Sequence, residues 1–192
     1  MTSPADGIVP DTKNWTWVLE RECPECGLDT RSVAPEQVAG MLREVTSSWH
    51  AVLTGKTALP GEVTARPDPS TWSPLEYGCH VRDVFRVFEG RLRLMLAEDD
   101  PLFPDWDQDR TAVEDRYGEQ DPATVAVELA EAGAGFADHF DAVSGEQWHR
   151  TGARDDGARF TVTTFARYLL HDAIHHVYDV TGVRAGPSSA AC

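Results

Sequence analysis

Residues 72–85, WSPLEYGCHVRDVF, decide how this chain folds. Ser73 suits the cap of a helix, Pro74 suits its first position, and Glu76 comes three residues after the cap, where it completes a capping box. Apolar residues then recur at spacings of three and four. This pattern predicts a helix over residues 74–97.

Three further helices are expected on either side of this one. Apolar spacing predicts a helix over residues 35–55, and Asp121 followed by Pro122 gives another cap-then-proline signal for a helix over residues 122–143. A last amphipathic pattern covers residues 161–181. Because no strand signal is comparable in strength, the sequence predicts an all-α fold, a four-helix bundle.

The connection over residues 97–121 is too long for a tight helical hairpin. The second helix is about 35 Å long, and an extended segment of this length can run back along it. The second and third helices would then be parallel, in a bundle with one long crossover.

We expect one domain with a segment at each end. The N-terminal arm covers residues 1–34, with a short strand near residues 15–19 and a CPECG turn; the bundle covers residues 35–182; a flexible tail covers residues 183–192.

The charge of the chain argues against two classes of partner. The formal net charge is −15, from 32 acidic and 17 basic residues, so nucleic acid and anionic membrane surfaces would be repelled. There is no apolar run long enough to cross a bilayer and no secretory signal pattern at the start, so a cytoplasmic location is expected.

The sequence HDAIHHVYDV at residues 171–180 contains three of the seven histidines. His171 and His175 are four residues apart, so on a helix both imidazoles can meet one metal ion. His176 is rotated by about 100° from His175 and is expected to pack beside the pair. If the last helix is antiparallel to the second, His80 lies near the pair and is the predicted third ligand.

Three neutral histidines with one open coordination position are typical of a catalytic zinc site, although nickel, iron or manganese also accept imidazole. The alternative is that such a pair is merely two polar rings near the surface. Asp83, Asp172 and Asp179 are candidates for orienting the imidazoles through their second nitrogens, and for Asp172 an ordinary solvated charge is the preferred interpretation.

Two motifs resemble those of the DinB/YfiT-like superfamily. WSPLEYGCH at residues 72–80 resembles the signature that opens its second helix, and HDAIH at residues 171–175 resembles its histidine pair in the last helix. The resemblance covers roughly residues 35–181. It implies a four-helix bundle with a long crossover and a divalent metal, often zinc or nickel, held by His80, His171 and His175.

The same resemblance implies a reaction class. Characterised members include mycothiol-dependent maleylpyruvate isomerases and thiol S-transferases, so the expected function is a metal-dependent S-transferase. In it the metal activates a small thiol such as mycothiol for attack on a small electrophile. The competing hypothesis is a non-catalytic, stress-associated metal-binding protein; a homodimer is a further expectation.

The walls of the expected site come from the crossover and the last helix. Their candidate residues are Asp107, Asp109, Arg110, Tyr117 and Tyr168, each of which is equally well explained as loop surface or packing.

The arm contains a second cysteine-based motif. Cys23 and Cys26 match one knuckle of a zinc ribbon, where Gly27 accepts the strained position of the turn. No second knuckle follows, and neither Cys79 nor Cys192 is a recognisable partner. Three interpretations remain: a second metal completed by histidine or by a neighbouring chain, a redox pair, or an inert turn.

Overall fold

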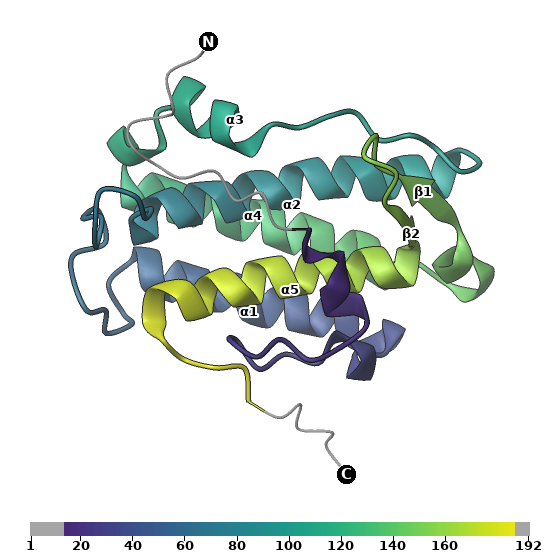
Figure 1. The fold of residues 1–192 in the computed structure, drawn as a ribbon, viewed down its shortest axis with the longest axis horizontal. Helices are drawn as coiled ribbons and strands as arrows, with labels where there is room; N and C mark the ends of the chain where they lie inside the picture. Colours follow the sequence, from purple (N-terminus) through teal and green to yellow (C-terminus); the bar gives the residue numbers. More distant parts are fainter. Residues whose placement is uncertain (1–13, 187–192) are drawn as a thin grey trace.

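Four long helices pack side by side in the computed structural model, which describes residues 14–186 (Figure 1). They are α1 (Val38–Leu53), α2 (Pro74–Ala97), α4 (Pro122–Asp141) and α5 (Val162–Thr181). The predicted all-α four-helix bundle is confirmed; the helices agree with the predicted ranges to within two residues, except that α1 begins at Val38 and not at Pro35, because residues 35–37 form a 3₁₀ turn.

The predicted capping signals define where two of these helices begin. The Ser73 hydroxyl accepts a hydrogen bond from the Glu76 amide at 3.2 Å, and the Glu76 carboxylate accepts one from the Ser73 amide at 2.8 Å, which is the reciprocal capping box. Asp121 caps α4 through the Thr124 amide, with Pro122 in the first helical position. Local sequence therefore fixes the starts of both helices before any packing is considered.

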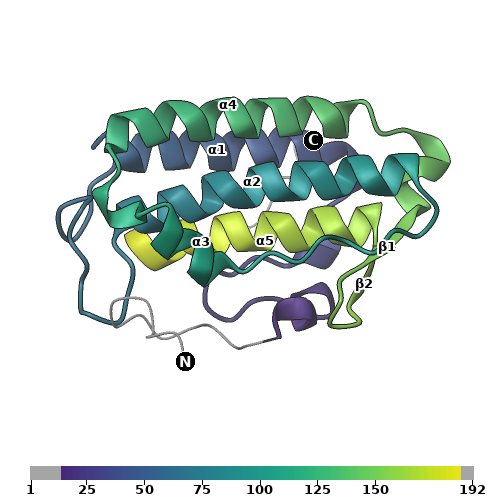
Figure 2. The same cartoon turned by 90° about the horizontal axis from the view of Figure 1, so that it is seen from above.

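Helices α2 and α4 run in the same direction, and α5 runs against them (Figure 2). Arg82 of α2 pairs with Glu128 of α4, near the beginning of each helix. By contrast the ring of His80, early in α2, lies 5.1 Å from that of His176, late in α5. This is the predicted arrangement, and it brings the start of α2 beside the end of α5.

The crossover between α2 and α4 runs back along the bundle (Figure 1). It contains two short elements that the sequence did not indicate, α3 (Gln108–Glu114) and the 3₁₀ turn η5 (Tyr117–Glu119). Asp107 caps α3 through the amide of Arg110 at 2.9 Å. The crossover thus returns ordered side chains to the end of the bundle where His80 lies.

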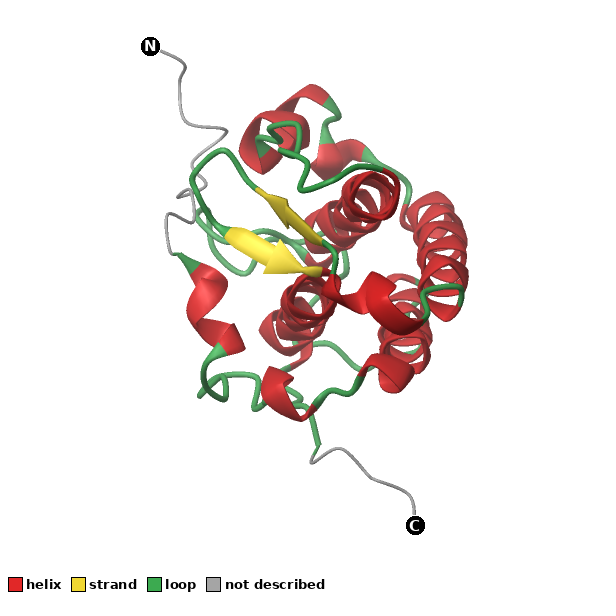
Figure 3. Cartoon of the chain, turned by 90° about the vertical axis from the view of Figure 1, so that its right-hand side faces the viewer, coloured by secondary structure: helices red, strands yellow, loops and turns green. Residues whose placement is uncertain are grey.

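A small hairpin precedes α5. Strands β1 (Thr151–Ala153) and β2 (Arg159–Thr161) pair antiparallel, with Gly152 opposite Phe160. Figure 3 looks along the bundle and shows the two strands at the near end of the helices. The Phe103 amide donates to the Ala153 carbonyl at 2.8 Å, so the hairpin also holds the start of the crossover.

The bundle core contains large side chains from all four long helices. The fully buried ones include Trp49, Phe85, Leu129, Phe136 and Phe165. Within the described residues no helix is long and apolar enough to cross a membrane.

The arm packs on the outside of α5. Its residues 15–19, where the sequence predicts a short strand, form a 3₁₀ turn, η2 (Trp15–Leu19), capped by Asn14; among residues 14–186 the strands β1 and β2 pair with each other and not with the arm. A second turn, η3 (Thr30–Ser32), is tied to the first by the Thr30 hydroxyl, which donates to the Val18 carbonyl at 2.5 Å. A third turn, η4 (Pro35–Gln37), leads directly into α1.

Candidate metal centres

Helix α5 presents two neighbouring faces that carry ligand-type side chains. A helix turns by about 100° per residue, so residues 171 and 175 share one face while residues 172 and 176 share the next. Thr161 caps the start of α5, and Gly182 ends it with a φ of +69°. Each face is completed by a different part of the chain.

The first face lies against the arm. One ligand atom from each of Cys23, Cys26, His171 and His175 lies within 4.8 Å of the others, and all four side chains are buried. We call these four residues the arm cluster. Cys23 Sγ lies 3.6 Å from His175 Nδ1.

The second face lies against α2. Ligand atoms of His80, Asp172 and His176 lie within 4.8 Å of one another, and we call these three residues the pocket cluster. The Nε2 atoms of His80 and His176 are each 3.7 Å from a carboxylate oxygen of Asp172. Two imidazole nitrogens therefore face one carboxylate.

Aromatic rings and a second carboxylate orient the pocket cluster. The His80 ring stacks on Trp106 at 5.8 Å between centroids and also contacts Trp72 at 5.4 Å. The Nδ1 atom of His176 lies 2.8 Å from Asp179, so its Nε2 atom is turned towards Asp172. Such contacts on the far side of an imidazole are typical of metal-binding histidines.

The protonation states of the clusters suit cation binding. Burial lowers the pKa of His171 to about 4, with His175 adding to the effect, and burial likewise lowers the pKa of His175. Burial by itself would raise the pKa of Asp172, but nearby His176 and His80 outweigh it and lower that pKa to about 2. At neutral pH the His171 and His175 imidazoles are neutral and Asp172 is an anion, the forms that bind metals.

Unpartnered buried atoms also support a cation in each cluster. Among the described residues, His80 Nδ1, His171 Nε2 and Asp172 Oδ1 are buried without a hydrogen-bond partner. An unsatisfied polar atom in a folded core costs about 1–3 kcal/mol, so such atoms need an explanation, and a bound ion is one. The donor sets themselves, thiol with imidazole and carboxylate with imidazole, are sets that divalent metals accept.

A pocket of about 540 Å³ opens beside the pocket cluster. Asp172 and His176 line it, together with aromatic residues from the arm, α2 and the crossover. Of its 17 lining residues only Arg154 has a permanent cationic side chain, whereas five are acidic: Glu25, Asp107, Asp109, Asp172 and Asp179. The negative charge of the lining favours a cation, and the one permanent cation, the Arg154 guanidinium, is paired with Asp156.

The structure distributes the three predicted ligands between two clusters. His171 and His175 lie together, with ring centroids 5.0 Å apart, but their neighbours are the two cysteines. His80 lies with Asp172 and His176 instead, because α2 packs against the next face of α5. From the sequence alone, Asp172 is expected to be a solvated charge and His176 a packing residue; the structure places both beside His80.

The expected wall residues also separate into two groups. Asp107, Asp109 and Tyr168 line the pocket. Arg110 lies on the surface of α3, where its Nε atom is 3.7 Å from Glu114, and Tyr117 is buried beneath the crossover. Neither Arg110 nor Tyr117 lines the pocket, because α3 directs Arg110 towards Glu114 on the surface and η5 directs Tyr117 towards Asp83.

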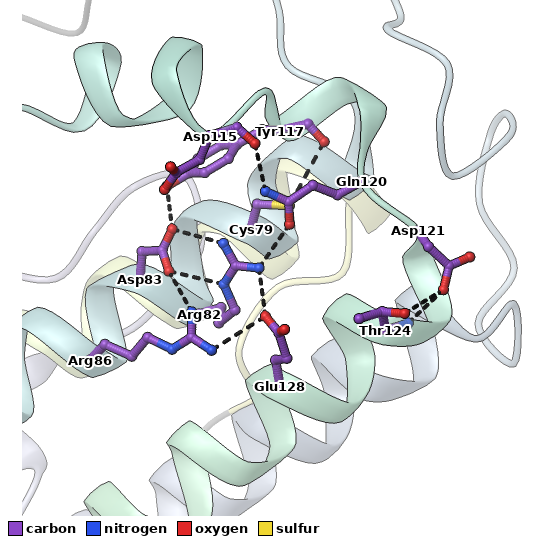
Figure 4. A network of polar contacts seen from close by, with 10 residues as sticks. All are labelled: Cys79, Arg82, Asp83, Arg86, Asp115, Tyr117, Gln120, Asp121, Thr124 and Glu128. Carbon is purple, nitrogen blue, oxygen red and sulfur yellow. Dashed lines mark hydrogen bonds and ion pairs between the residues drawn. The ribbon is translucent and has the colours of Figure 1, made fainter.

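Tyr117 belongs to a buried polar network between α2, η5 and α4 (Figure 4). Its hydroxyl donates to Asp83 at 2.6 Å, and the same carboxylate accepts two hydrogen bonds from Arg82 at 2.9 Å each. Arg82 also reaches Gln120 and Glu128, both at 2.8 Å. Asp83, predicted as a partner of a histidine, therefore fixes the crossover to the bundle.

The sequence contained a signal for the pocket cluster. Asp172 and His176 have the same spacing of four residues as His171 and His175. Spacing alone ranks the two pairs equally, and only the direction from which α2 and the arm approach α5 assigns a partner to each.

Fold and site together define the class of protein, a four-helix bundle with a long crossover and candidate metal ligands where α2 and α5 meet. Residues 41–180 match the family model of the DinB superfamily, and the chain belongs to this family. A search of curated proteins found no match.

One solved structure with a similar fold is YfiT from Bacillus subtilis, described as a probable metal-dependent hydrolase with an unusual four-helix bundle topology. The two chains are 17% identical, and the TM-score is 0.69 over 79% of this chain and 87% of YfiT. At this level of identity the likeness concerns the fold.

Proposed function

We propose that this protein is a metal-dependent enzyme in which His80, Asp172 and His176 hold a divalent ion, zinc or nickel, beside the pocket. The observation that carries the proposal is that two of the three ligand residues, Asp172 and His176, line a pocket of 540 Å³, and that the buried His80 has a ligand atom within 4.8 Å of both. Within the part of the chain that the structure describes, no fourth histidine, cysteine or carboxylate completes the cluster. Three protein ligands with one open position are typical of catalytic sites, whereas structural sites are closed.

The proposed reaction is transfer of a low-molecular-weight thiol, of the mycothiol type, to a small electrophile. A divalent metal in the cluster supplies Lewis acidity, which lowers the pKa of a thiol in the open position. This choice rests on the resemblance to thiol-dependent relatives and on the pocket volume, which is large enough for a thiol and a second small molecule.

The other pocket residues have roles that follow from their chemistry. Trp72 and Trp106 hold the His80 ring in position and give the pocket apolar walls that exclude water. Arg154 lies within hydrogen-bond reach of the Tyr168 hydroxyl, at 3.3 Å, and it is the group that can orient an anionic electrophile.

Metal analysis of single variants tests this site. His176→Ala should lose one equivalent of divalent metal per chain and the thiol-consuming activity, because it removes one of three ligands. His149→Ala is the matched control, since His149 is exposed at the end of the turn η6 (Gly145–His149), far from both clusters in the bundle. Activity is measured as consumption of mycothiol with a reactive electrophile.

Three outcomes would change the proposal. Full metal content in His176→Ala would exclude this cluster as the site. Metal loss without any thiol activity in the wild type would favour the non-catalytic, stress-associated alternative. Ester or amide hydrolysis without thiol consumption would keep the metal site but replace the thiol by water as the nucleophile.

A further inference from the structure

The arm cluster lies outside the pocket chemistry proposed above. We propose that its four side chains bind one zinc ion in a closed Cys₂His₂ site, and that this ion fixes the N-terminal arm to α5. The proposed role is structural, and it does not depend on the proposed reaction.

The distance between two of the donor atoms is that of ligands on one ion. Zinc binds thiolate sulfur at about 2.3 Å and imidazole nitrogen at about 2.0–2.1 Å in tetrahedral geometry, which places the two donors about 3.6 Å apart. Cys23 Sγ and His175 Nδ1 lie 3.6 Å apart. This separation matches two ligands of one ion and equally a thiol–imidazole hydrogen bond, so the distinction is carried by the other two donor atoms, from Cys26 and His171, which lie within 4.8 Å of both.

The cysteine turn has the backbone geometry that directs two sulfurs to one point. The Gly27 amide donates to the Cys23 carbonyl at 2.9 Å, and the Cys23 amide donates to the Leu28 carbonyl at 3.0 Å. Gly27 has a φ of +81°, a conformation that a residue with a side chain rarely adopts. The half-motif seen in the sequence is thus a folded knuckle, and α5 supplies the other two ligands.

The histidines are oriented as metal ligands are. His175 turns Nδ1 to Cys23, while its Nε2 lies 3.2 Å from Glu25 and 3.6 Å from Asp179. His171 Nε2 is buried and has no hydrogen-bond partner among the described residues. Carboxylates behind a ligating imidazole fix its tautomer and raise its basicity.

Burial argues for a closed metal site and against a redox pair. Cys23 and Cys26 are both 0% exposed, and the pocket wall includes both imidazoles but neither sulfur. A redox-active thiol must be reached by a second thiol or a disulfide, and this geometry denies such access. The rings of Trp15 and Trp17 pack over His171 at 5.5 and 6.4 Å between centroids.

An ion here would join three separate parts of the chain. Besides the arm and α5, the segment after α5 closes over the turn, where the Ala185 amide donates to the Cys26 carbonyl at 2.7 Å. Arg184 donates to the Pro24 carbonyl at 2.8 Å. Zinc binding releases the two thiol protons to solvent, and the resulting thiolates balance the charge of the ion.

Cobalt substitution of the full chain tests the proposal directly. The wild-type protein with Co²⁺ should show the near-ultraviolet charge-transfer band of thiolate ligands, together with the strong visible bands of a tetrahedral ion. The double variant Cys23→Ser, Cys26→Ser should lose the charge-transfer band and one equivalent of zinc. Cys79→Ala is the control, because Cys79 is equally buried but lies on α2 outside the cluster.

Two results would overturn the proposal: a folded wild-type chain without the charge-transfer band, or a band that survives in the double variant. The wild-type spectrum decides the matter even if the double variant fails to fold. His176→Ala separates the two sites, since it should lose pocket metal and keep the thiolate band. Loss of that band in His176→Ala would contradict the independence of the two sites.

Discussion

At the scale of single residues, the buried carboxylate of Asp83 joins the crossover to the bundle. In the folded chain it is 7% exposed and contacts Arg82 and Tyr117. No spacing rule within α2 could reveal this, because Tyr117 comes from a crossover whose path is set by tertiary packing.

Asp83 should make the protein sensitive to acid. Burial would raise its pKa, but hydrogen bonds and charge from Arg82 and the Tyr117 hydroxyl outweigh burial, so the pKa lies below its ordinary value. Its contribution to the free energy of unfolding is therefore full above the unfolded pKa of about 3.9 and is lost as the pH falls towards the folded pKa.

Asp83→Asn tests this at the same residue. The variant should be less stable at pH 7 by about 3 kcal/mol, because Arg82 loses a buried partner, and its stability should fall less steeply below pH 4. Urea unfolding across pH 3–7 measures both effects. Asp138→Asn on the surface of α4 is the control, and an equally steep acid limb in both variants would contradict the assignment.

At the scale of elements, α1 and α4 are in close contact at Gly133. A β-carbon there would lie 2.2 Å from Thr46 Oγ1, which is far inside the contact distance. Gly135, two residues later, has nothing within 4 Å of the same position. The two glycines therefore separate the effect of helix packing from that of helix propensity.

Substitution of each glycine by alanine should change stability in opposite directions. Gly133→Ala should reduce the free energy of unfolding by about 1–3 kcal/mol, because the two helices must separate. Gly135→Ala should raise it by about 0.5–1 kcal/mol, since alanine has the higher helix propensity and the added methyl group meets nothing within 4 Å. Thermal and urea unfolding measure both, and a stabilised Gly133→Ala would show that the helix contact is looser than described.

The same scale explains what could be predicted from the sequence. Capping residues such as Ser73 and Asp121 act within one helical turn, so the first residues of these helices could be predicted from the sequence. The hairpin at residues 151–161 and the short helix α3 were not, because each has only a few residues and depends on contacts with the bundle. For the site, the structure places His80 beside His176 near the end of α5, and the face of α5 that meets His80 depends on how the helices pack.

At the scale of the whole molecule, the two proposed metal sites differ in access to solvent. Asp172 and His176 of the pocket cluster line the pocket; the two imidazoles of the arm cluster line it as well, but its two sulfurs are 0% exposed. A chelator can compete for an ion only where it can reach it or where the site opens.

Zinc should therefore leave the loaded protein in two well-separated phases when excess chelator is added. The fast phase should be missing in His176→Ala and the slow phase in Cys26→Ser, while His149→Ala keeps both. A chromogenic chelator follows the release in real time. One phase that contains all the zinc of the wild-type protein would contradict the distinction between an open and a closed site.

The two ligand-bearing faces of α5 constrain how this helix can rotate about its own axis. Residues 171 and 175 face the arm, whereas residues 172 and 176 face α2. The two pairs are offset by one residue in the chain. Insertion or deletion of a single residue between Val162 and Leu170 would turn each pair by about 100°, which would move His171 and His175 away from the cysteines, or Asp172 and His176 away from His80. Only one rotation of α5 about its own axis satisfies both clusters, so together they fix the orientation of this helix.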